Sequence, residues 1–359
     1  MSEDKTAVIT GGGGFVIANV VRLWLGRDPA ARAIVVDASP LDAAAKRHFA
    51  PFAERLQFVI GDVGKAETWA GLPTDAGYVV HGAAVTPMRY IDAEGRPRNP
   101  EREDPLRVIE ANMLGTARAL DWARRLPALS RFVYVSTGSV YADLVPAQES
   151  DPFPLPEDGY IGPIALYDIT KYGGELLTQR FAELYDMPAY TVRLASVFGP
   201  MDRATPFRNV RNAANHIAHA AVAGRPVRAT TADAVGDYIY APDVADAIHR
   251  MLAVRRERLK HPVYNLAYGE PKDISELVAV AAETRPGLKL EIVPEAEADI
   301  KISNKRKTGR WGAYDISRAA QDLGWKPRPL AAAFADYIDW IRAHESSGSS
   351  APLESSAGG

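Results

Sequence analysis

The segment TGGGGFVIAN, residues 10 to 19, places four consecutive glycines directly behind the apolar run AVIT (7 to 10). A strand that turns into a helix over glycines presents backbone N–H groups and a helix N-terminus, which together bind phosphate. Gly11 and Gly14 have the spacing of a dinucleotide-binding turn, but the third glycine of that pattern is replaced by Ile17. We expect Ile17 to push the helix outward or to turn its bulk toward the core, with dinucleotide binding retained. A relic fold that no longer binds nucleotide is the alternative.

The composition of the 359 residues excludes several functional classes. With 42 Lys plus Arg against 45 Asp plus Glu, the net charge of -3 provides no basic field for nucleic acid or an anionic membrane. The absence of cysteine excludes disulfides, thiolate nucleophiles and Cys-ligated metal centres. No apolar run approaches the roughly 20 residues that span a bilayer, and MSEDKTAVIT lacks the apolar core of a signal peptide. We therefore expect a cytoplasmic protein.

Short apolar runs alternate with longer amphipathic stretches along the chain. Because these runs are continuously apolar, they indicate parallel strands covered on both faces, with helical crossovers between them. The predicted fold is doubly wound α/β. The predicted strands are AVIT (7 to 10), AIVVD (33 to 37), LQFVIGD (56 to 62), YVVHGAA (78 to 84), RFVYVST (131 to 137), AYTVRLAS (189 to 196) and PVYNLA (262 to 267).

Helical apolar periods predict further elements in the second half. DVADAIHRMLAV (243 to 254) has such a period, and so does DISELVAVAAE (273 to 283), with Asp273 placed to cap it. Near the end, AAFADYIDWIRA spaces three apolar side chains along one helical face. They are Phe334, Ile338 and Ile341.

The segment ALYDITKYGGELLTQRFAELY (165 to 185) places Tyr167 and Lys171 four residues apart, on one face of a predicted helix. Lowering the pKa of a phenol from 10 by about three units requires roughly 4 kcal/mol of preference for the phenolate. A neighbouring ammonium and an oxidised nicotinamide would supply that preference. Ordinary solvated helix faces also produce this spacing, so the pair gains meaning only from its context.

Upstream, RFVYVSTGSVYA (131 to 142) puts Ser136 and Thr137 at the carboxyl end of a predicted strand, the edge where ligands bind in open parallel sheets. A hydroxyl there can hold the substrate oxygen that Tyr167 protonates or deprotonates. The alternative is that Thr137 and Ser139 only satisfy backbone groups at the strand end.

Ten motifs of the chain, in their order and spacing, resemble the extended short-chain dehydrogenases/reductases, the NAD-dependent epimerase/dehydratase group. The resemblance implies a Rossmann-type domain that binds NAD(P), a smaller C-terminal α/β substrate domain, and hydride transfer at a carbon bearing a hydroxyl. It also implies that Thr137 orients the substrate hydroxyl, Tyr167 acts as general acid/base, and Lys171 holds the nicotinamide ribose and lowers the tyrosine pKa. The motifs are TGGGGF (10 to 15), Asp37, GDV (61 to 63), HGAA (81 to 84), NMLGT (112 to 116), VSTGSVYA (135 to 142), YDITK (167 to 171), RLASVFGP (193 to 200), DYIYAPDVADA (237 to 247) and DISRAAQDLGWKP (315 to 327).

The expected domain boundaries follow from this resemblance. The NAD-binding domain would comprise residues 1 to 195 plus 236 to 266, and the substrate domain residues 196 to 235 plus 267 to 343. Residues 344 to 359 lack apolar periodicity and are expected to be a disordered tail.

Asp37, at the end of the second predicted strand, indicates which dinucleotide binds. Its carboxylate would accept hydrogen bonds from ribose hydroxyls and repel a 2′-phosphate. The next residues, Ala38, Ser39 and Pro40, offer no arginine to neutralise that phosphate, so we expect NAD rather than NADP. By resemblance the other cofactor-binding residues are Gly11, Gly14, Phe15, Val16, Asp62, Val63, Ala83, Ala84, Tyr167 and Lys171.

Three departures from the family pattern bear on the substrate. Dehydratases of this group follow the catalytic threonine with an Asp-Glu pair, whereas this chain has Gly138 and Ser139, so dehydration is disfavoured. Two residues that grip a nucleotide-sugar diphosphate in the family are replaced by Ser196 and Gly236. The segment TPMRYIDAEGRPRNPEREDPL (86 to 106) is longer than usual and would be either a lid, with Thr86, Met88 and Arg89 closest to the chemistry, or a solvated loop, which we favour from Arg96 onward.

Arg203, Arg208 and Arg211, which follow the sixth predicted strand in the sequence, could bind an acidic or polyhydroxylated substrate in place of the missing diphosphate-binding residues. Guanidinium groups bind carboxylate and phosphate in bidentate fashion. The alternative is that they are surface arginines on a flexible segment. The predicted substrate contacts are Thr86, Ser139, Ser196, Arg203, Arg208 and Arg211.

Other polar residues are expected to have structural roles. Asn112 is predicted to brace the sheet, and His81 to be a structural residue at a strand end. His216 and His219 lie three apart on a predicted helix without an accompanying carboxylate motif, so no metal site is expected.

These observations favour an NAD-dependent dehydrogenase of a sugar, sugar acid or similar hydroxylated small molecule. The alternative is a nucleotide-sugar 4-epimerase with tightly held NAD, and a third hypothesis is a nucleotide-sensing protein without turnover. Broad apolar faces on the helices at 105 to 126 and 168 to 185 predict a homodimer, since such helices pair in the resembling family. The residues of these faces are Leu120, Leu126, Leu176, Leu177, Phe181 and Leu184.

Overall fold

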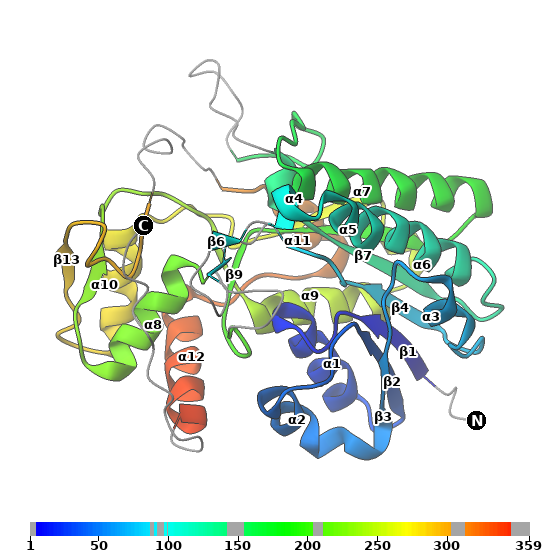
Figure 1. Ribbon diagram of the computed structural model, residues 1–359, viewed down its shortest axis with the longest axis horizontal. Helices are drawn as coiled ribbons and strands as arrows, with labels where there is room; N and C mark the ends of the chain where they lie inside the picture. Colours follow the sequence, from blue (N-terminus) through cyan, green and yellow to red (C-terminus); the bar gives the residue numbers. More distant parts are fainter. Residues whose placement is uncertain are drawn as a thin grey trace.

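The computed structural model describes residues 5–86, 90–91, 97–98, 100–141, 154–203, 211–302 and 313–345 (Figure 1). These residues form a seven-stranded parallel sheet with helices on both faces, and a smaller lobe of helices and short strands. The prediction of a doubly wound α/β fold with a smaller C-terminal α/β part is therefore confirmed.

The large sheet has the strand order β12-β8-β7-β4-β1-β2-β3, and every neighbouring pair is parallel. All seven predicted strands are present. From β1 the chain adds strands first toward β3 and then toward β12, so the strand order reverses between β1 and β4. Ligands of such sheets bind at the carboxyl ends of the strands beside this reversal. The strands are β1 (Lys5–Thr10), β2 (Ala31–Asp37), β3 (Leu56–Ile60), β4 (Tyr78–His81), β7 (Arg131–Thr137), β8 (Ala189–Leu194) and β12 (Val263–Leu266).

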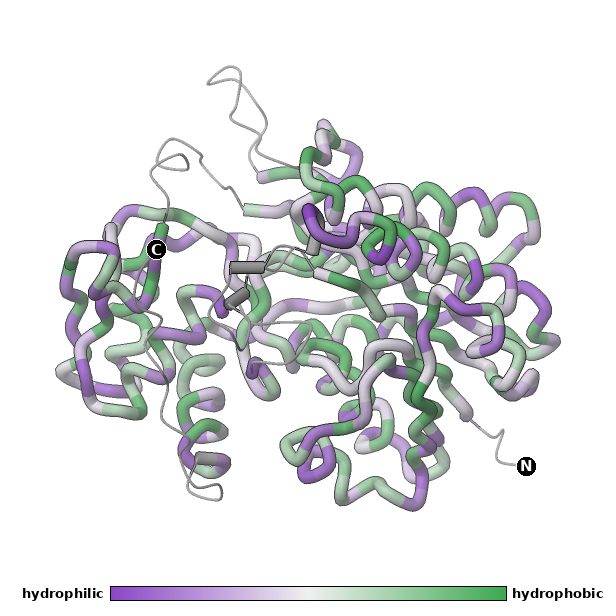
Figure 2. Tube along the Cα trace, viewed as in Figure 1, coloured by the Kyte–Doolittle hydropathy of each residue, from purple (hydrophilic) through white to green (hydrophobic). Residues whose placement is uncertain are grey.

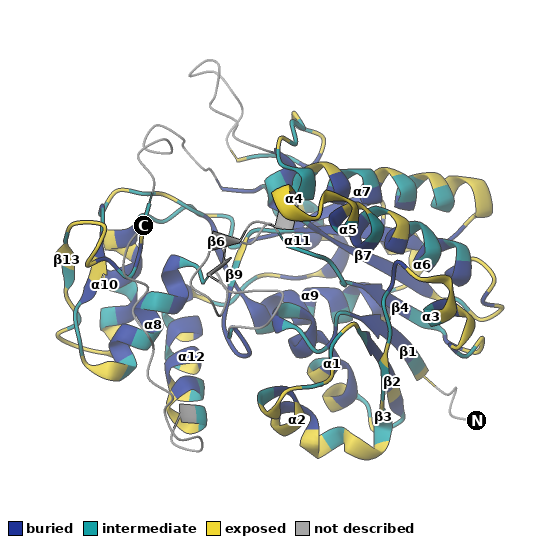
Figure 3. Cartoon of the chain, viewed as in Figure 1, coloured by how far each residue is buried: buried dark blue, intermediate teal, exposed yellow. Residues whose placement is uncertain are grey.

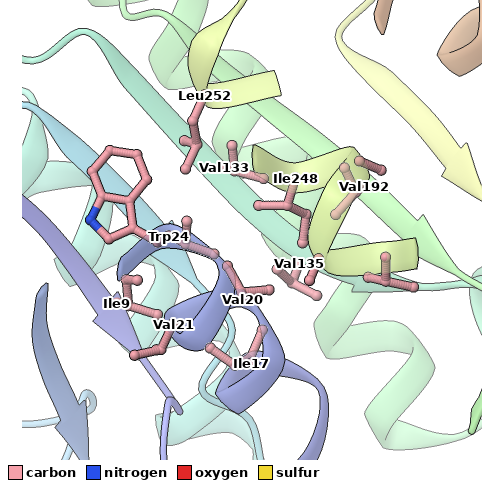
Figure 4. Packing of buried hydrophobic residues seen from close by; sticks show 14 of the residues in the cluster. Ile9, Ile17, Val20, Val21, Trp24, Val133, Val135, Val192, Ile248 and Leu252 are labelled. Atoms are coloured by element: carbon pink, nitrogen blue, oxygen red, sulfur yellow. The ribbon is translucent and has the colours of Figure 1, made fainter. Parts of the chain in front are cut away.

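Helices cover both faces of this sheet. The helices α1 (Phe15–Arg27) and α9 (Ala241–Ala253) pack on one face, where Ala7 and Ile9 of β1 join their hydrophobic cluster (Figure 4). The helices α6 (Gly115–Ala123) and α7 (Leu166–Tyr185) cover the other face, with Val8 in the cluster beneath them. Because successive side chains of a strand point to opposite faces, burial on both sides requires the continuous apolar runs seen in the sequence. Figure 2 shows these hydrophobic runs along the strands of the sheet.

The predicted helix at 105 to 126 is interrupted in the structure. It consists of α5 (Pro105–Ile109), a π-helical turn η2 (Glu110–Leu114) and α6, which ends at Ala123. Single π turns occur frequently at functional sites. The remaining elements of this half are α2 (Ala43–Phe49), η1 (Ala50–Arg55), α3 (Ala66–Ala70), the strand pair β5 (Tyr90–Ile91) and β6 (Pro97–Arg98), α4 (Pro100–Glu103), and η3 (Gly138–Tyr141).

A smaller lobe, at the left of Figure 1, has its own core. Phe334, Ile338 and Ile341 are buried in it, as the helical period predicted. Asp273 caps its helix as expected, in a reciprocal capping box with Glu276. The elements of the lobe are α8 (Ala213–Ala223), β10 (Val227–Ala229), α10 (Ile274–Thr284), β13 (Leu290–Ile292) and α12 (Leu330–Glu345), and the strand pair β9 (Ser196–Phe198) and β11 (Tyr238–Tyr240) connects it to the large sheet.

The division into two domains at the expected boundaries stays a prediction. One element of the 267 to 343 segment, α11 (Ser317–Leu323), packs with Trp325 in the core beneath the large sheet rather than in the smaller lobe. The short helix η4 (Arg256–Arg258) follows α9. Residues 346–359 of the expected tail lie outside the described residues. No helix in the described part of the chain is long and apolar enough to cross a membrane.

Candidate active site

The glycine turn between β1 and α1 is shaped for close approach of a ligand to the backbone. Gly11 has a φ of 75°, a conformation that L side chains rarely adopt, and its N–H donates to the Val36 carbonyl at 2.8 Å. A Cβ at Gly11 would lie 2.8 Å from the backbone of Ala83, at the end of β4. Gly14 occupies the N-cap position of α1 and provides no capping side chain. The positive end of the helix dipole therefore faces the turn, as phosphate binding requires.

Ile17 does not obstruct this turn. Its side chain is 5% exposed and belongs to the core between α1 and the sheet, where Figure 4 shows it near Val20 and Val21. The tip of the Ile17 side chain lies over Gly82, where any Cβ would collide with it. Because Gly82, just after β4, has no side chain, it leaves the space for Ile17 that a third glycine on α1 would otherwise have made unnecessary. The second of the two expected outcomes, with the bulk turned toward the core, is confirmed.

Asp37 lies at the carboxyl end of β2, beside the glycine turn. Its Oδ2 accepts the Gly13 N–H at 3.0 Å and its Oδ1 accepts the Ser39 N–H at 3.3 Å. Burial raises the pKa of this carboxyl, while these N–H groups and the Arg203 guanidinium act to lower it. The turn, the uncapped helix and this carboxylate fit an adenine dinucleotide: backbone N–H groups for the pyrophosphate and a carboxylate for the ribose hydroxyls.

The remaining predicted cofactor residues surround the same edge of the sheet. Phe15 is buried and Val16 half-buried in the first turn of α1, while Ala83 and Ala84 are half-buried just after β4. Asp62 accepts from Arg107, with Nη1 2.9 Å from Oδ2, an ion pair that the sequence did not reveal. Val63 is buried against the sheet. The roles of these residues remain predictions.

Two of the catalytic candidates, Thr137 and Lys171, lie at the end of β7. The Lys171 Nζ donates to the carbonyl of Val135, two residues before Thr137, so this face of α7 lies on the last residues of the strand. Tyr167 lies one turn earlier on the same helix and is half-buried. Thr137 Oγ1 lies 3.0 Å from Ser139 Oγ and accepts the Ser139 N–H. The structure therefore contains a bond of the kind expected if Thr137 only satisfied backbone groups at the strand end. The Thr137 hydroxyl still lies at the edge of the sheet where ligands bind.

Lys171 is a buried cation of unusual acidity. Its side chain lies with Nζ 4.5 Å from the centre of the Tyr134 ring, and the residue is 3% exposed. Burial lowers the pKa of Lys171 to about 7, although the charge of Glu175 acts in the opposite direction. A lysine in this range changes its charge with small changes in its surroundings near neutral pH.

A buried polar network that the sequence did not predict lies beneath the catalytic candidates. Glu175, one turn after Lys171 on α7, accepts from Arg193 of β8 at 2.7 Å and from the Ser136 hydroxyl at 2.5 Å. The Arg193 Nη1 also donates to the Tyr141 hydroxyl and to the Glu157 carbonyl, both at 2.9 Å. A charged residue inside the apolar run AYTVRLAS was the available signal, because a buried arginine requires a carboxylate partner.

Gly138, directly after Thr137, has no space for a side chain. Any Cβ there would collide with the hydroxyl of Tyr314, which is buried at the junction of the two lobes against Tyr141. The position of Tyr314 therefore leaves no room for an acidic side chain at residue 138.

The predicted substrate residues are dispersed. Ser196 begins β9 with its side chain exposed, Thr86 is half-buried after β4, and Arg211 is half-buried before α8. Arg203 reaches back to the glycine turn, where Nε donates to Asp42 at 2.7 Å and Nη2 to the Gly13 carbonyl at 3.1 Å. No local pattern in the sequence indicates this position, because the contact spans about 160 residues of sequence. Arg208, Met88, Arg89 and Arg96 lie outside the described residues.

The residues expected to be structural have structural contacts. His81 is fully buried between Thr10 and Thr116, with its ring nitrogens 2.8 and 3.2 Å from their hydroxyls, and burial lowers its pKa to about 3. Asn112, in the π turn, bonds both backbone groups of Val85 and the hydroxyl of Thr170, and so braces the segment after β4 against α7. Within the described residues no group of three or more His, Asp or Glu side chains is arranged to hold a metal ion.

Comparison with known proteins shows which family and fold the chain resembles. The chain is 28% identical to the dTDP-glucose 4,6-dehydratase of Mycolicibacterium smegmatis over 347 residues, which covers 94% of each chain. It is 24% identical to the UDP-glucose 4-epimerase of the same organism over 93% of this chain and 98% of that protein. The crystal structure of the Thermotoga maritima UDP-glucose 4-epimerase with UDP-glucose has the same fold, with a TM-score of 0.73 and 22% identity over 94% of this chain and 99% of that one.

A second solved structure, the Bacillus cereus UDP-glucuronic acid 4-epimerase with UDP-glucuronic acid and NAD, gives a TM-score of 0.71 and 19% identity over 94% of this chain and 99% of the other. The NAD dependent epimerase/dehydratase family matches residues 7–267 of the sequence. This chain therefore belongs to the NAD dependent epimerase/dehydratase family, as its ordered motifs and its glycine turn indicated.

Proposed function

We propose that this enzyme oxidises or reduces a hydroxyl-bearing carbon of a sugar-like substrate with NAD, using Thr137, Tyr167 and Lys171. One observation carries the proposal: the glycine turn, Asp37, Thr137 and the Lys171 face of α7 lie at the carboxyl edge of one parallel sheet. NAD, when bound, supplies the hydride acceptor or donor. Gly11, Gly14 and Asp37 would hold it, since their backbone and carboxylate groups fit its pyrophosphate and ribose.

The protein groups divide the proton chemistry between them. Thr137 would hold the substrate oxygen, because its Oγ1 is fixed against Ser139 at the strand end. Tyr167 would take the hydroxyl proton during oxidation and return it during reduction. Lys171 would lower the pKa of that phenol from the same helix face, and its own pKa of about 7 makes its charge responsive to what binds beside it.

Dehydration is disfavoured by the packing at Gly138. An elimination at neighbouring sugar carbons needs an additional acid and base, which the family's dehydratases carry directly after the threonine. Here the Tyr314 hydroxyl occupies the space where the first of these side chains would start. The protein groups present thus support proton transfer at a single hydroxyl.

The hydride either leaves with NADH, as in a dehydrogenase, or returns to the substrate, as in an epimerase, and a different observation favours each outcome. Ser196 and Gly236 stand in the places of two diphosphate-binding residues, which favours a dehydrogenase of a sugar or sugar acid that releases NADH. The nucleotide sugars named for the two solved epimerases favour a nucleotide-sugar 4-epimerase in which NAD stays bound. The first is our main proposal because it follows from this chain's own residues.

Incubating the purified enzyme with NAD and a panel of sugars, sugar acids and nucleotide sugars tests the proposal. Accumulation of NADH at 340 nm supports the dehydrogenase, whereas isomer formation without NADH supports the epimerase. The Tyr167→Phe variant should abolish either activity while retaining NAD binding. No turnover with any substrate class would leave the nucleotide-sensing hypothesis and overturn the proposal.

We also propose that the enzyme is a homodimer that pairs through α7 and the helices beside it. Leu176 and Leu184 of α7 are 49% and 53% exposed, and Ile169 of the same helix is also exposed. Figure 3 shows exposed positions along α7. The other residues of the predicted faces, Leu120, Leu126, Leu177 and Phe181, pack instead in or against the core beneath α6 and α7. Sedimentation of the wild type and of Leu176→Asp tests this: a dimer that the substitution dissociates supports it, and a wild-type monomer contradicts it.

A further inference from the structure

The Arg203 side chain extends from the segment after β9 to the glycine turn between β1 and α1. Both Nε and Nη2 lie 2.7 Å from Asp42 Oδ2, at the N-cap of α2, and Nη2 donates to the Gly13 carbonyl at 3.1 Å. The Arg203 side chain is 18% exposed, whereas that of Asp42 is 45% exposed. The guanidinium is therefore held against the turn, with its carboxylate partner on the solvent side.

The backbone before Arg203 is fixed in an unusual conformation. Met201 has a φ of 70°, in the left-handed region that is uncommon for a side chain of its size, and it is 1% exposed. The Asn19 side chain of α1 donates to the Pro200 carbonyl at 3.0 Å, which ties this segment to the first helix of the sheet. The Arg203 Nη1 donates to the Met201 carbonyl at 3.2 Å. Such conformations persist where the surroundings enforce them, and they concentrate at functional sites.

The charges around Gly13 are arranged in a pair. Asp37 binds its N–H and Arg203 binds its carbonyl, so a carboxylate and a guanidinium flank one residue of the turn. The Arg203 charge is close enough to lower the pKa of Asp37 against the larger effect of burial. Near this turn the α1 N-terminus provides only partial positive charge, whereas Arg203 provides a full one.

We propose that Arg203 is a cofactor-binding residue, supplied by the segment after β9, whose positive charge favours the dinucleotide phosphates at the glycine turn. Asp42 holds the guanidinium in place against the turn. The inference rests on NAD binding alone and is independent of which substrate the enzyme takes.

Calorimetric titration of NAD, without any substrate, tests the proposal on wild type, Arg203→Gln and Arg225→Gln. Arg225 is a matched control because it forms a similar ion pair, 2.5 Å to Asp299, within the smaller lobe. We expect Arg203→Gln to weaken NAD binding about ten-fold and to reduce the salt dependence of the affinity, since one charge-assisted contact is lost. Arg225→Gln should leave both unchanged.

Titrations with ADP-ribose and with adenosine separate the charge from a general effect on the turn. Loss of ADP-ribose affinity with adenosine affinity retained supports the proposal. Equal affinities of Arg203→Gln and Arg225→Gln for NAD, or equal losses for ADP-ribose and adenosine, would overturn it. If Arg203→Gln does not fold, Arg203→Lys is the substitute, because it keeps the positive charge but lacks the planar guanidinium with its several donors. It should weaken NAD binding about three-fold relative to Arg225→Lys.

Discussion

Two buried cations lie close together beneath the active site, and their environments differ. Arg193 donates to Glu175 through two guanidinium nitrogens, Nε and Nη2, in an ion pair whose side chains are 3% and 0% exposed. Lys171, one turn before Glu175, instead donates to a backbone carbonyl and lies over the Tyr134 ring. Among the described residues no carboxylate forms an ion pair with it. The pKa of Arg193 is raised by Glu175 against the cost of burial, whereas burial lowers that of Lys171 to about 7.

We interpret the Arg193 charge as structural and the Lys171 charge as one suited to the proposed proton chemistry. A buried cation with a bidentate carboxylate keeps its proton at every working pH and fixes the strands and helix that meet at it. A buried cation without that partner sits near its titration point, which suits a group that must adjust the pKa of a neighbouring phenol. The experiments below test this contrast, beginning with the largest expected effect.

Replacing Glu175 with alanine should destabilise the fold by about 3–5 kcal/mol, because it leaves the Arg193 charge buried without a partner. Chemical denaturation measures the change. Glu183→Ala on the same helix is the control, since its pair with Arg180 is exposed and should be worth at most about 1 kcal/mol. Equal effects of the two substitutions would show that the buried pair is not structural.

Replacing Lys171 with methionine should have the opposite profile. The turnover rate should fall about 10²- to 10³-fold, because the phenol loses the cation that lowers its pKa. The free energy of unfolding near pH 7 should stay the same or rise, since a buried ammonium without a carboxylate partner has been removed. A large loss of stability with little loss of turnover would contradict the chemical role of Lys171.

The pH dependence of stability should also report Lys171. Its folded pKa, about 7, lies below its unfolded value of about 10.4, so the unfolded chain binds more protons between these values and stability rises with pH there. Relative to Lys171→Met, the wild type should gain up to about 2 kcal/mol between pH 7 and pH 9. Comparing the two proteins cancels the other titrating groups. A difference that stays flat or falls over this range would refute the lowered pKa.

Removing the Ser136 hydroxyl should have the smallest effect. Ser136→Ala deletes one of the hydrogen bonds to Glu175 and leaves the Arg193 pair intact, so we expect a loss of about 1 kcal/mol in the free energy of unfolding. Urea denaturation of this variant beside Ser130→Ala, whose hydroxyl is bonded only weakly on the surface, checks the estimate. A loss as large as that of Glu175→Ala would mean that the hydroxyl, rather than Arg193, is the main partner of Glu175.

The parts of the site that sequence analysis predicted well are those built by neighbours in the chain. The glycine turn, Asp37 at the end of its strand, and the Tyr167–Lys171 spacing each lie within one element or one connection, where local geometry dictates position. The contacts of Arg203 and Tyr314 were not predicted, for the opposite reason. Each acts on a residue more than 150 positions away, Gly13 and Gly138 respectively, and no local pattern encodes such a meeting.

The amino-acid sequence by itself determined the alternation of buried strands and covering helices, the glycine turn and the helix that carries Tyr167 and Lys171, because hydrophobic periodicity and glycine spacing act over a few residues. Only the tertiary structure decided how Ile17 is accommodated, which buried cation has a carboxylate, and where Arg203 binds. These depend on side chains brought together from distant strands, and close packing leaves each of them a single position.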